Sequence, residues 1–209
     1  DLPLKSMSLV NIVRSQKIPF QKLYDMILDP DVSLSFNQIE ELKLTKINIA
    51  ERQCTIRFRK CITENPRLRK LKLEECAITN NYIREELSGV LMKEMPHLQV
   101  LDIDLGFKLF FVGDQASKVK FLSPTLQQLR IRALFESPQS VVHLLRQIEE
   151  NHKLFKLELE YLGTEIFQAP HLRGIKDYFE GKEKSKSLKS FELRVPRDLF
   201  RMNFDRTIR

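Results

Sequence analysis

The sequence has few of the residues that build disulfide frameworks, phosphate-binding loops or membrane spans. Its 209 residues include three cysteines and six glycines, and no stretch approaches the roughly 18 uninterrupted apolar residues of a membrane-spanning helix. The cysteines Cys54, Cys61 and Cys76 show no C-x-x-C spacing, and no N-x-S/T acceptor is present. We therefore expect a reducing compartment, cytoplasmic or nuclear, and a chain with no disulfide, no metal, no cofactor and no membrane partner.

Catalytic motifs are missing as well. The chain has no G-x-S-x-G, no Walker-type G-x-x-x-x-G-K and no G-x-G-x-x-G, and its four histidines show no metal-ligand spacing. Cys61 or Cys76 beside His97 would be the nucleophile and base to consider, but both cysteines fall at core positions of the repeat described below. A buried thiol is unreactive, so we predict that the protein is not an enzyme.

The composition is that of a folded chain. Hydrophobic residues make up 42% and charged residues 30%, which leaves no long disordered tail and permits a sizeable core. The chain opens with Asp1 rather than Met, and its first residues already follow the repeat pattern. We expect residues 1–209 to form one domain, an excerpt of a longer protein, with no signal peptide at its start.

An internal repeat organises the whole chain. The pattern L-x-x-L-x-L, with Ile, Met or Phe standing in for Leu, occurs seven times, and the first positions lie 35, 29, 30, 28, 28 and 34 residues apart. Proline stands two residues before three of these triplets, where it ends a preceding helix and favours an extended entry. We expect each triplet to form a short strand. The triplets begin at Leu4, Ile39, Leu68, Leu98, Leu126, Leu154 and Leu188.

Between the triplets the apolar period changes from that of a strand to that of a helix. Apolar residues recur three or four positions apart, which gives each intervening segment one apolar face. A strand and helix of this size cannot bury their apolar residues alone, so neighbouring units must share one core. The expected helical faces are Phe20, Leu23, Tyr24 and Ile27; Cys54, Phe58, Cys61 and Ile62; Ile83, Leu87, Val90 and Leu91; Val141, Leu144, Leu145 and Ile148; and, more weakly, Leu172, Ile175 and Phe179.

With these repeats the chain resembles the leucine-rich-repeat proteins, in particular the ribonuclease-inhibitor-like and F-box-protein classes, which have a full helix per repeat. The strongest match is LRKLKLEECAIT, residues 68–79, in which Cys76 takes the Asn or Cys position of the family pattern. Ile47 and Gly106 stand there in the flanking repeats, so we expect a patchy hydrogen-bond ladder beneath the strands. The resemblance implies an α/β fold: a curved horseshoe solenoid of about seven irregular repeats, with a parallel inner sheet, outer helices and residues 194–209 as a C-terminal cap.

Two segments depart from the repeat. Residues 109–124 have no helical stripe and carry a polar, glycine-containing insert, which indicates an irregular repeat or a protruding loop. Residues 181–189 form a lysine-rich connection before the last triplet. We expect both to be solvated surface loops, although loops on a repeat scaffold are common binding elements.

Function in such a solenoid is expected on the inner, concave face of the sheet. The residue between the last two apolar positions of each triplet, and the residue just after them, point out of that face. Lys72, Asp102, Arg130 and Glu158 would form a lateral ladder of alternating charge. This ladder is either a recognition surface for a protein partner or self-neutralising surface charge, and its mixed sign argues against a phosphate backbone in the groove. The candidate partner-binding residues are Lys43, Lys72, Glu74, Asp102, Asp104, Arg130, Arg132, Glu158 and Glu160.

The resemblance also implies that the product of this domain is an interface. Proteins with this repeat class act as substrate-recognition arms of ubiquitin ligases, as regulatory platforms or as assembly scaffolds. We therefore interpret the chain as a non-catalytic scaffold or substrate-recognition module for a protein partner. The sequence leaves the identity of that partner and the oligomeric state open.

A dense basic stretch supports a second interpretation. The net charge of +7 is diffuse, but residues 51–72 carry eight basic and two acidic residues. This stretch is a solvated helix face, a surface for an acidic protein partner, or the surface of an RNA-associated adaptor, as in the repeat domains of messenger-RNA export factors. A third interpretation is a structural segment that packs on a neighbouring domain of its own chain. The alternative basic surface comprises Arg52, Arg57, Arg59, Lys60, Arg67 and Arg69.

Overall fold

The fold is α/β, with a parallel sheet on one side and helices on the other. The computed structural model describes residues 5–10, 18–19, 24–25, 38–49, 52–76, 95, 97–109, 125–135, 137–148, 151–180, 187–196 and 199. Within these ranges it contains one seven-stranded sheet, one two-stranded sheet and three α-helices. The predicted α/β class and parallel sheet are confirmed.

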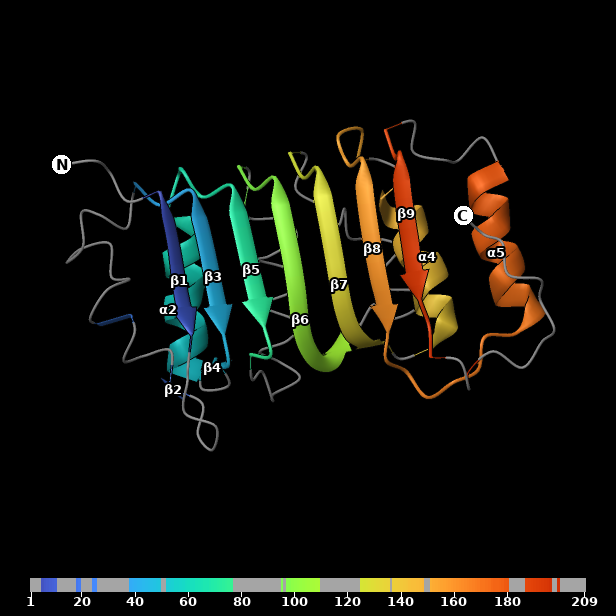
Figure 1. Ribbon diagram of the computed structural model, residues 1–209, viewed down its shortest axis with the longest axis horizontal. Helices are drawn as coiled ribbons and strands as arrows, with labels where there is room; N and C mark the ends of the chain where they lie inside the picture. Colours follow the sequence, from blue (N-terminus) through green and yellow to red (C-terminus); the bar gives the residue numbers. More distant parts are fainter. Residues whose placement is uncertain are drawn as a thin grey trace.

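The large sheet is built from seven strands that follow one another in chain order, all parallel (Figure 1). A two-stranded parallel pair, β2 (Ile18–Pro19) and β4 (Ile47–Asn48), lies near the N-terminal end of the row. The register between β6 and β7 shifts between Asp104 and Lys108, just before the segment 109–124 that was predicted to be irregular. The seven strands are β1 (Ser6–Val10), β3 (Glu41–Thr45), β5 (Lys70–Glu74), β6 (Val100–Leu109), β7 (Gln128–Phe135), β8 (Lys156–Tyr161) and β9 (Ser190–Arg194).

All seven predicted triplets lie in register. The last two apolar positions of each triplet occupy alternate positions of a strand and pair laterally with the same positions of the next strand, as Leu71 does with Leu42 and Leu101. From β3 to β8 these residues are almost completely buried, because alternate residues of a strand share one face. The apolar face of the sheet is therefore one continuous layer running across the repeats.

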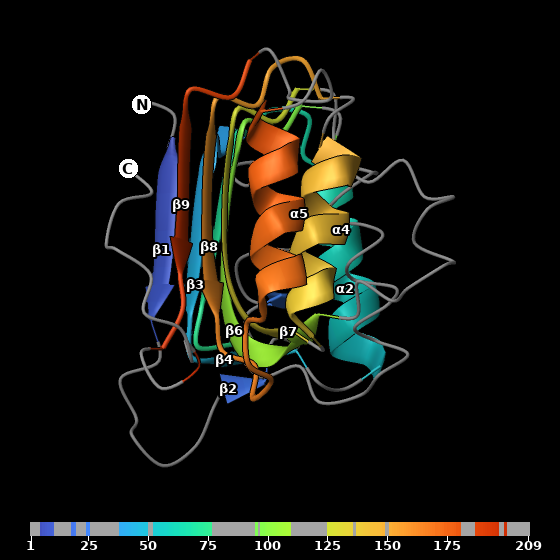
Figure 2. The same cartoon turned by 90° about the vertical axis from the view of Figure 1, so that its right-hand side faces the viewer.

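The helices cover only that apolar face. Figure 2 shows α2 (Arg52–Thr63), α4 (Pro138–Ile148) and α5 (Ala169–Glu180) together on one side of the sheet. The predicted apolar stripes of the first two are confirmed, since all eight predicted residues are buried. In α5, Ile175 and Tyr178 are buried, whereas Leu172 and Phe179 are partly buried and pack against the core. The Phe179 ring lies against Phe191 of β9, with 4.8 Å between the ring centroids.

Several predicted segments lie outside the described residues. The predicted helical face from Ile83 to Leu91 is among them, as is most of the face from Phe20 to Ile27, of which Tyr24 is described and buried. Of the two predicted loops, only Leu109 and residues 187–189 are described. Within the predicted cap, Val195 and Leu199 pack against the core, and the carbonyl of Leu199 accepts a hydrogen bond from the Phe167 amide at 3.1 Å.

Each repeat begins with the same backbone hydrogen bonds. One carbonyl at the start of each strand accepts two consecutive amides of the following repeat, at donor–acceptor distances of 2.8–3.2 Å. Successive repeats therefore share one local conformation at this end, although their sequences differ there. The six accepting carbonyls belong to Lys5, Glu40, Arg69, Gln99, Gln127 and Phe155.

Side chains reinforce this connection. The carbonyl of the first apolar residue of a repeat accepts a side-chain hydrogen bond from the next repeat in three cases: Ile39 from Asn65 at 3.0 Å, Leu98 from Thr125 at 2.9 Å and Leu154 from Ser187 at 2.8 Å. These side chains satisfy carbonyls that would otherwise be buried without a partner. The repeats are thus linked by polar contacts as well as by the apolar layer.

The opposite strand ends show the expected patchy ladder. The Cys76 thiol donates to the carbonyl of Leu44 at 3.5 Å, whereas Ile47, at the equivalent position one repeat earlier, is buried and has no side-chain donor. Lys46 and Glu75 follow β3 and β5 with left-handed φ angles of 58° and 51°. Their amides donate to strand-end carbonyls of the next repeat at 2.9 and 2.7 Å, which offsets the cost of this conformation.

Candidate functional site

The candidate site is the face of the sheet that none of the described helices covers, which we call the open face (Figure 2). Each strand contributes three side chains to it, because residues alternate between the two faces of a strand. The parallel register aligns these residues in three lateral rows. The middle row is Ser8, Lys43, Lys72, Asp102, Arg130, Glu158 and Glu192, and the row after it is Val10, Thr45, Glu74, Asp104, Arg132, Glu160 and Arg194.

The first row holds residues that the sequence analysis did not single out. It consists of Ser6, Glu41, Lys70, Val100, Gln128, Lys156 and Ser190. Lys70 pairs with Glu41 across β5 and β3, and Lys156 contacts Glu158 at 2.7 Å along β8. These residues could have been found from the sequence, because they lie two positions before the middle row in each strand and therefore share its face.

The open face carries equal numbers of both charges. Its 21 positions hold seven cationic and seven anionic side chains, so their formal sum is zero. The charges are confined to β3 and the strands that follow it, because β1 contributes only Ser6, Ser8 and Val10. The cations are Lys43, Lys70, Lys72, Arg130, Arg132, Lys156 and Arg194, and the anions are Glu41, Glu74, Asp102, Asp104, Glu158, Glu160 and Glu192.

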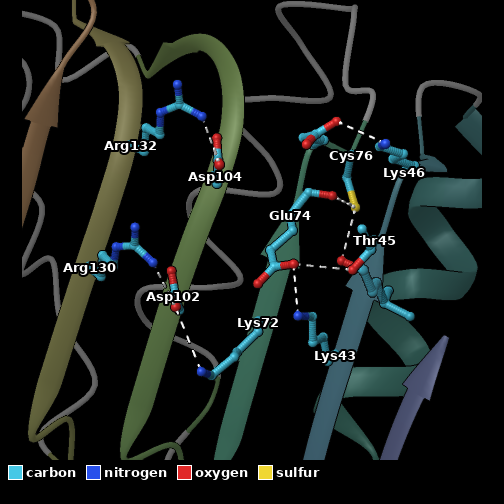
Figure 3. Close-up of polar contacts among 12 residues, drawn as sticks. Lys43, Thr45, Lys46, Lys72, Glu74, Cys76, Asp102, Asp104, Arg130 and Arg132 are labelled. Atoms are coloured by element: carbon cyan, nitrogen blue, oxygen red, sulfur yellow. Dashed lines mark hydrogen bonds and ion pairs between the residues drawn. The ribbon is translucent and has the colours of Figure 1, made fainter. Parts of the chain in front are cut away.

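The two arginines of β7 each lie between two carboxylates. Arg132 donates from Nη1 to Asp104 and from Nε to Glu160, both at 3.0 Å. Arg130 lies 3.5 Å from Asp102 through Nη1 and 3.7 Å from Glu158 through Nε. Figure 3 shows both guanidinium groups directed toward the aspartates of β6. The predicted lateral ladder is therefore formed, and its centre is β7.

Carboxylates at the centre of the open face are more covered than cations. The Asp102 side chain is 12% exposed, against 43% for Lys72 and 42% for Arg130 on either side of it. A short aspartate between two long cationic side chains is shielded by their stems. Burial raises the pKa of Asp102, and the attraction of Arg130 and Lys72 only partly offsets that effect.

The ladder is less regular over β3 and β5. Lys43 and Lys72 are lateral neighbours of the same sign, and Lys43 instead reaches Glu74 in the following row, with 2.8 Å between Nζ and Oε2 (Figure 3). Thr45 also donates to Glu74, at 3.3 Å. The hydrogen bond from Lys43 is the main reason that the pKa of Glu74 is lowered. Diagonal contacts thus compensate where lateral neighbours repel.

A shallow depression lies where β7, β8 and β9 meet on the open face. It is lined by Arg130, Glu158, Glu160, Glu192 and Arg194 together with Leu159, and it holds about 10 Å³. This volume is about that of one water molecule. The depression therefore suits a contact with a side-chain tip of a partner better than a small-molecule ligand.

The residues of the alternative basic surface are brought together only in part. Arg52, Arg57, Arg59 and Lys60 belong to α2, whereas Arg67 and Arg69 lie in the turn before β5. Sequence alone did not reveal the partners of these side chains, most of which come from distant segments. Arg57 pairs with Asp25 and stacks over the Tyr24 ring at 5.1 Å, Arg67 bonds Gln38, and Arg69 donates to the carbonyls of Pro66 and His97 at 3.2 and 3.5 Å.

The three cysteines are buried. Burial raises the pKa of Cys61 well above its ordinary value, with a smaller contribution from Glu64, so the thiol is protonated at neutral pH. Within the described ranges, no group of three or more His, Cys, Asp or Glu side chains is arranged to hold a metal ion. In the same ranges no helix is long and apolar enough to span a bilayer.

No protein-family model matches this sequence, and no curated protein sequence is significantly similar to it. The functional argument therefore rests on the geometry of the open face.

Proposed function

We propose that this chain is a leucine-rich-repeat solenoid that acts as a non-catalytic protein-interaction module and contacts its partner through the open face. Three observations support the solenoid. The triplets lie in lateral register, the strands follow chain order, and the same carbonyl at the start of each repeat accepts two amides of the next. Repeats that contact only their neighbours in this way are typical of solenoids.

The main observation in support of the interaction function is that Arg132 and Arg130 are held in place and yet remain exposed. Each guanidinium is held between two carboxylates, yet 39% of the Arg132 side chain and 42% of the Arg130 side chain remain exposed. Arginine held in a fixed orientation at the centre of a surface is a frequent anchor of protein interfaces. The cytoplasmic or nuclear location and a role as a substrate-recognition arm or scaffold are consistent with this proposal and form part of it.

A nucleic-acid partner fits the open face less well. Phosphate backbones bind to tracks of positive charge, and the affinity depends on how many phosphates are neutralised. The open face has a formal charge of zero, and Glu158 and Glu160 interrupt any cationic track across β8. We therefore propose a protein partner, and we treat RNA binding through α2 as an outcome that the following experiment detects.

The test is affinity capture from cell lysate with three forms of the chain. One form is the wild type, and the second is the charge swap Asp104→Arg with Arg132→Asp. The swap keeps the net charge. In the row formed by Glu74, positions 104 and 132, and Glu160, the wild type has two attractive neighbouring pairs and one repulsive pair, and the swapped chain has the same numbers. The third form, Arg57→Glu with Arg59→Glu, alters α2 and leaves the open face intact.

We expect the wild type and the α2 variant to retain a discrete protein that the charge swap loses, with urea unfolding showing that all three forms are folded. Capture that depends on Arg57 and Arg59 and disappears on nuclease treatment would replace this proposal with an RNA-associated role. If no protein distinguishes the wild type from the swap, the open face is not the contact surface. Self-association that an upstream extension of the chain relieves would instead favour a structural segment.

A further inference from the structure

The carboxylates around β7 use only part of each guanidinium group. Asp104 and Glu160 occupy Nη1 and Nε of Arg132, and Asp102 and Glu158 lie beside the same two nitrogens of Arg130. No hydrogen bond joins Nη2 of either arginine to another of the described residues. Each Nη2 carries two N–H donors, and a guanidinium group can also stack on an aromatic ring through its planar face; 42% of the Arg130 side chain and 39% of the Arg132 side chain are exposed.

The surroundings of these free donors are electrically neutral. Lys72 lies 3.8 Å from Asp102 and Lys156 lies 2.7 Å from Glu158, so the eight side chains around β7 comprise four cations and four anions. An anion that approaches Nη2 is attracted by one guanidinium but repelled by the two carboxylates that hold it. An uncharged acceptor gains the hydrogen bonds without that repulsion.

The arrangement also lowers the entropic cost of binding. A free arginine loses side-chain freedom when a partner immobilises it, and that loss weakens binding. Contacts on both sides of β7 already hold Arg132 in place, with both hydrogen bonds at 3.0 Å. A preorganised donor of this kind gains more from one new contact than a mobile lysine at the same position.

We infer that Arg130 and Arg132 anchor an uncharged segment of a protein partner, whose main-chain carbonyls accept hydrogen bonds from the two Nη2 groups and whose aromatic side chain stacks on a guanidinium face. This inference rests on the proposed function, because it specifies the chemistry of the partner that the open face binds. It applies to the open face and not to α2, whose four cations have no carboxylate on the same helix and include two that pair with acidic residues outside it, Arg57 with Asp25 and Lys60 with Glu64.

The experiment uses a phage-displayed library of random peptides as the probe. The library is selected on the folded wild-type chain, with counter-selection on the double variant Arg130→Lys, Arg132→Lys. Lysine keeps the positive charge and can pair with the carboxylates, but it has a single terminal nitrogen and lacks the planar face of a guanidinium group. The matched control is Arg146→Lys, which makes the same change at an exposed position of α4, a helix on the opposite side of the sheet (Figure 2).

We expect the recovered peptides to have a net charge near zero and to contain an aromatic residue. They should bind the double lysine variant about tenfold more weakly than the wild type and bind Arg146→Lys as tightly as the wild type. Their affinity should change less than about threefold between 50 and 200 mM salt, a range in which phosphate-binding proteins lose roughly 10³–10⁵.

Predominantly acidic peptides, peptides that bind the lysine variant equally well, or no arginine-dependent peptides at all would overturn the inference. Unfolding curves in urea show whether the lysine variant is folded, and Arg132→Lys alone provides a milder change if the double variant is not. A protein captured from lysate that is lost on the charge swap but bound normally by the lysine variant would leave the proposed function standing and overturn only this inference.

Discussion

The open face carries seven cations and α2 carries four, and the two regions arrange them differently. On the open face the cations of β5 and β7 alternate with carboxylates of β6 and β8, and the parallel register places each beside the next. On α2 the four cations have no carboxylate within the helix, and Arg57 finds its partner in Asp25, 32 residues earlier in the chain. Local charge density therefore says little about a surface until the neighbours of each side chain are known.

The two regions also differ in what holds them to the fold. The open-face side chains stand on strands whose backbone hydrogen bonds and buried leucines fix their positions. The side of α2 that faces the sheet is apolar, with Cys54, Phe58 and Cys61 completely buried. Both regions therefore carry charged side chains at their surface, whereas burial of apolar side chains fixes the strands and the helix that bear them.

Phe58→Ala should produce the largest effect, because the cavity it leaves lies between α2 and the sheet. We expect a loss of about 3–5 kcal/mol in the free energy of unfolding, as for other buried aromatic residues. Urea unfolding followed by circular dichroism measures it. Arg59→Ala on the same helix is the matched control and should cost less than about 0.5 kcal/mol. Equal losses for the two variants would contradict the assignment of α2 stability to its apolar side.

The coupling between Arg132 and Asp104 should exceed that between Arg57 and Asp25. Arg132 belongs to a network in which Glu160 fixes the other side of the guanidinium, whereas the Asp25 side chain is half exposed. Double-mutant cycles with alanine should give about 0.5–1 kcal/mol for the open-face pair and less than about 0.5 kcal/mol for the α2 pair. The reverse order would show that lateral register does not strengthen these contacts.

Asp102 should make the protein less stable as the pH rises. Burial raises the pKa of the folded-state carboxyl, so between the unfolded value of about 3.9 and the raised folded value the unfolded chain releases its proton first. The free energy of unfolding of the wild type, measured relative to Asp102→Asn, should therefore fall across this window, by less than about 1 kcal/mol. A rise would mean that attraction by Arg130 and Lys72 outweighs burial.

Glu74 should show the opposite slope on the same face. Its pKa is lowered chiefly by the hydrogen bond from Lys43, so its contribution to stability is present above the unfolded value of about 4.3 and is lost as the pH falls through the lowered folded value. Relative to Glu74→Gln, the wild type should gain at most a few tenths of a kcal/mol with rising pH, because the side chain is partly exposed. Urea unfolding at a series of pH values measures both slopes, and parallel slopes for Asp102 and Glu74 would contradict the account.

The sequence predicted the strands and the open face because both follow from strict periodicity. Seven triplets at similar spacing determine which residues pair, and alternation determines which of them face away from the helices. The lateral neighbours of Asp102 were therefore identified without coordinates. The burial of Asp102 was not, because it depends on the lengths of the side chains of Lys72 and Arg130 and not on the pattern.

Contacts outside the strand register could not be predicted in this way. The diagonal pair of Lys43 with Glu74 depends on side-chain rotamers that relieve the repulsion between Lys43 and Lys72. The pair of Arg57 with Asp25 joins α2 to a residue that lies outside the strands, so no strand register determines it. In α5, Tyr178 is buried where the sequence predicted Phe179, and Phe179 is only partly buried, against Phe191 of β9. Periodicity determines the face of an element, and tertiary packing selects the individual residues.

The most direct test of the central claim is a nuclear magnetic resonance titration of the labelled chain with the protein captured by affinity. The account predicts that the amide shifts that change most belong to residues 100–104, 128–132 and 156–160, the central strands beneath the open face. It also predicts little change over residues 52–60 of α2. Shifts concentrated on α2, with the three central strands unaffected, would contradict the account.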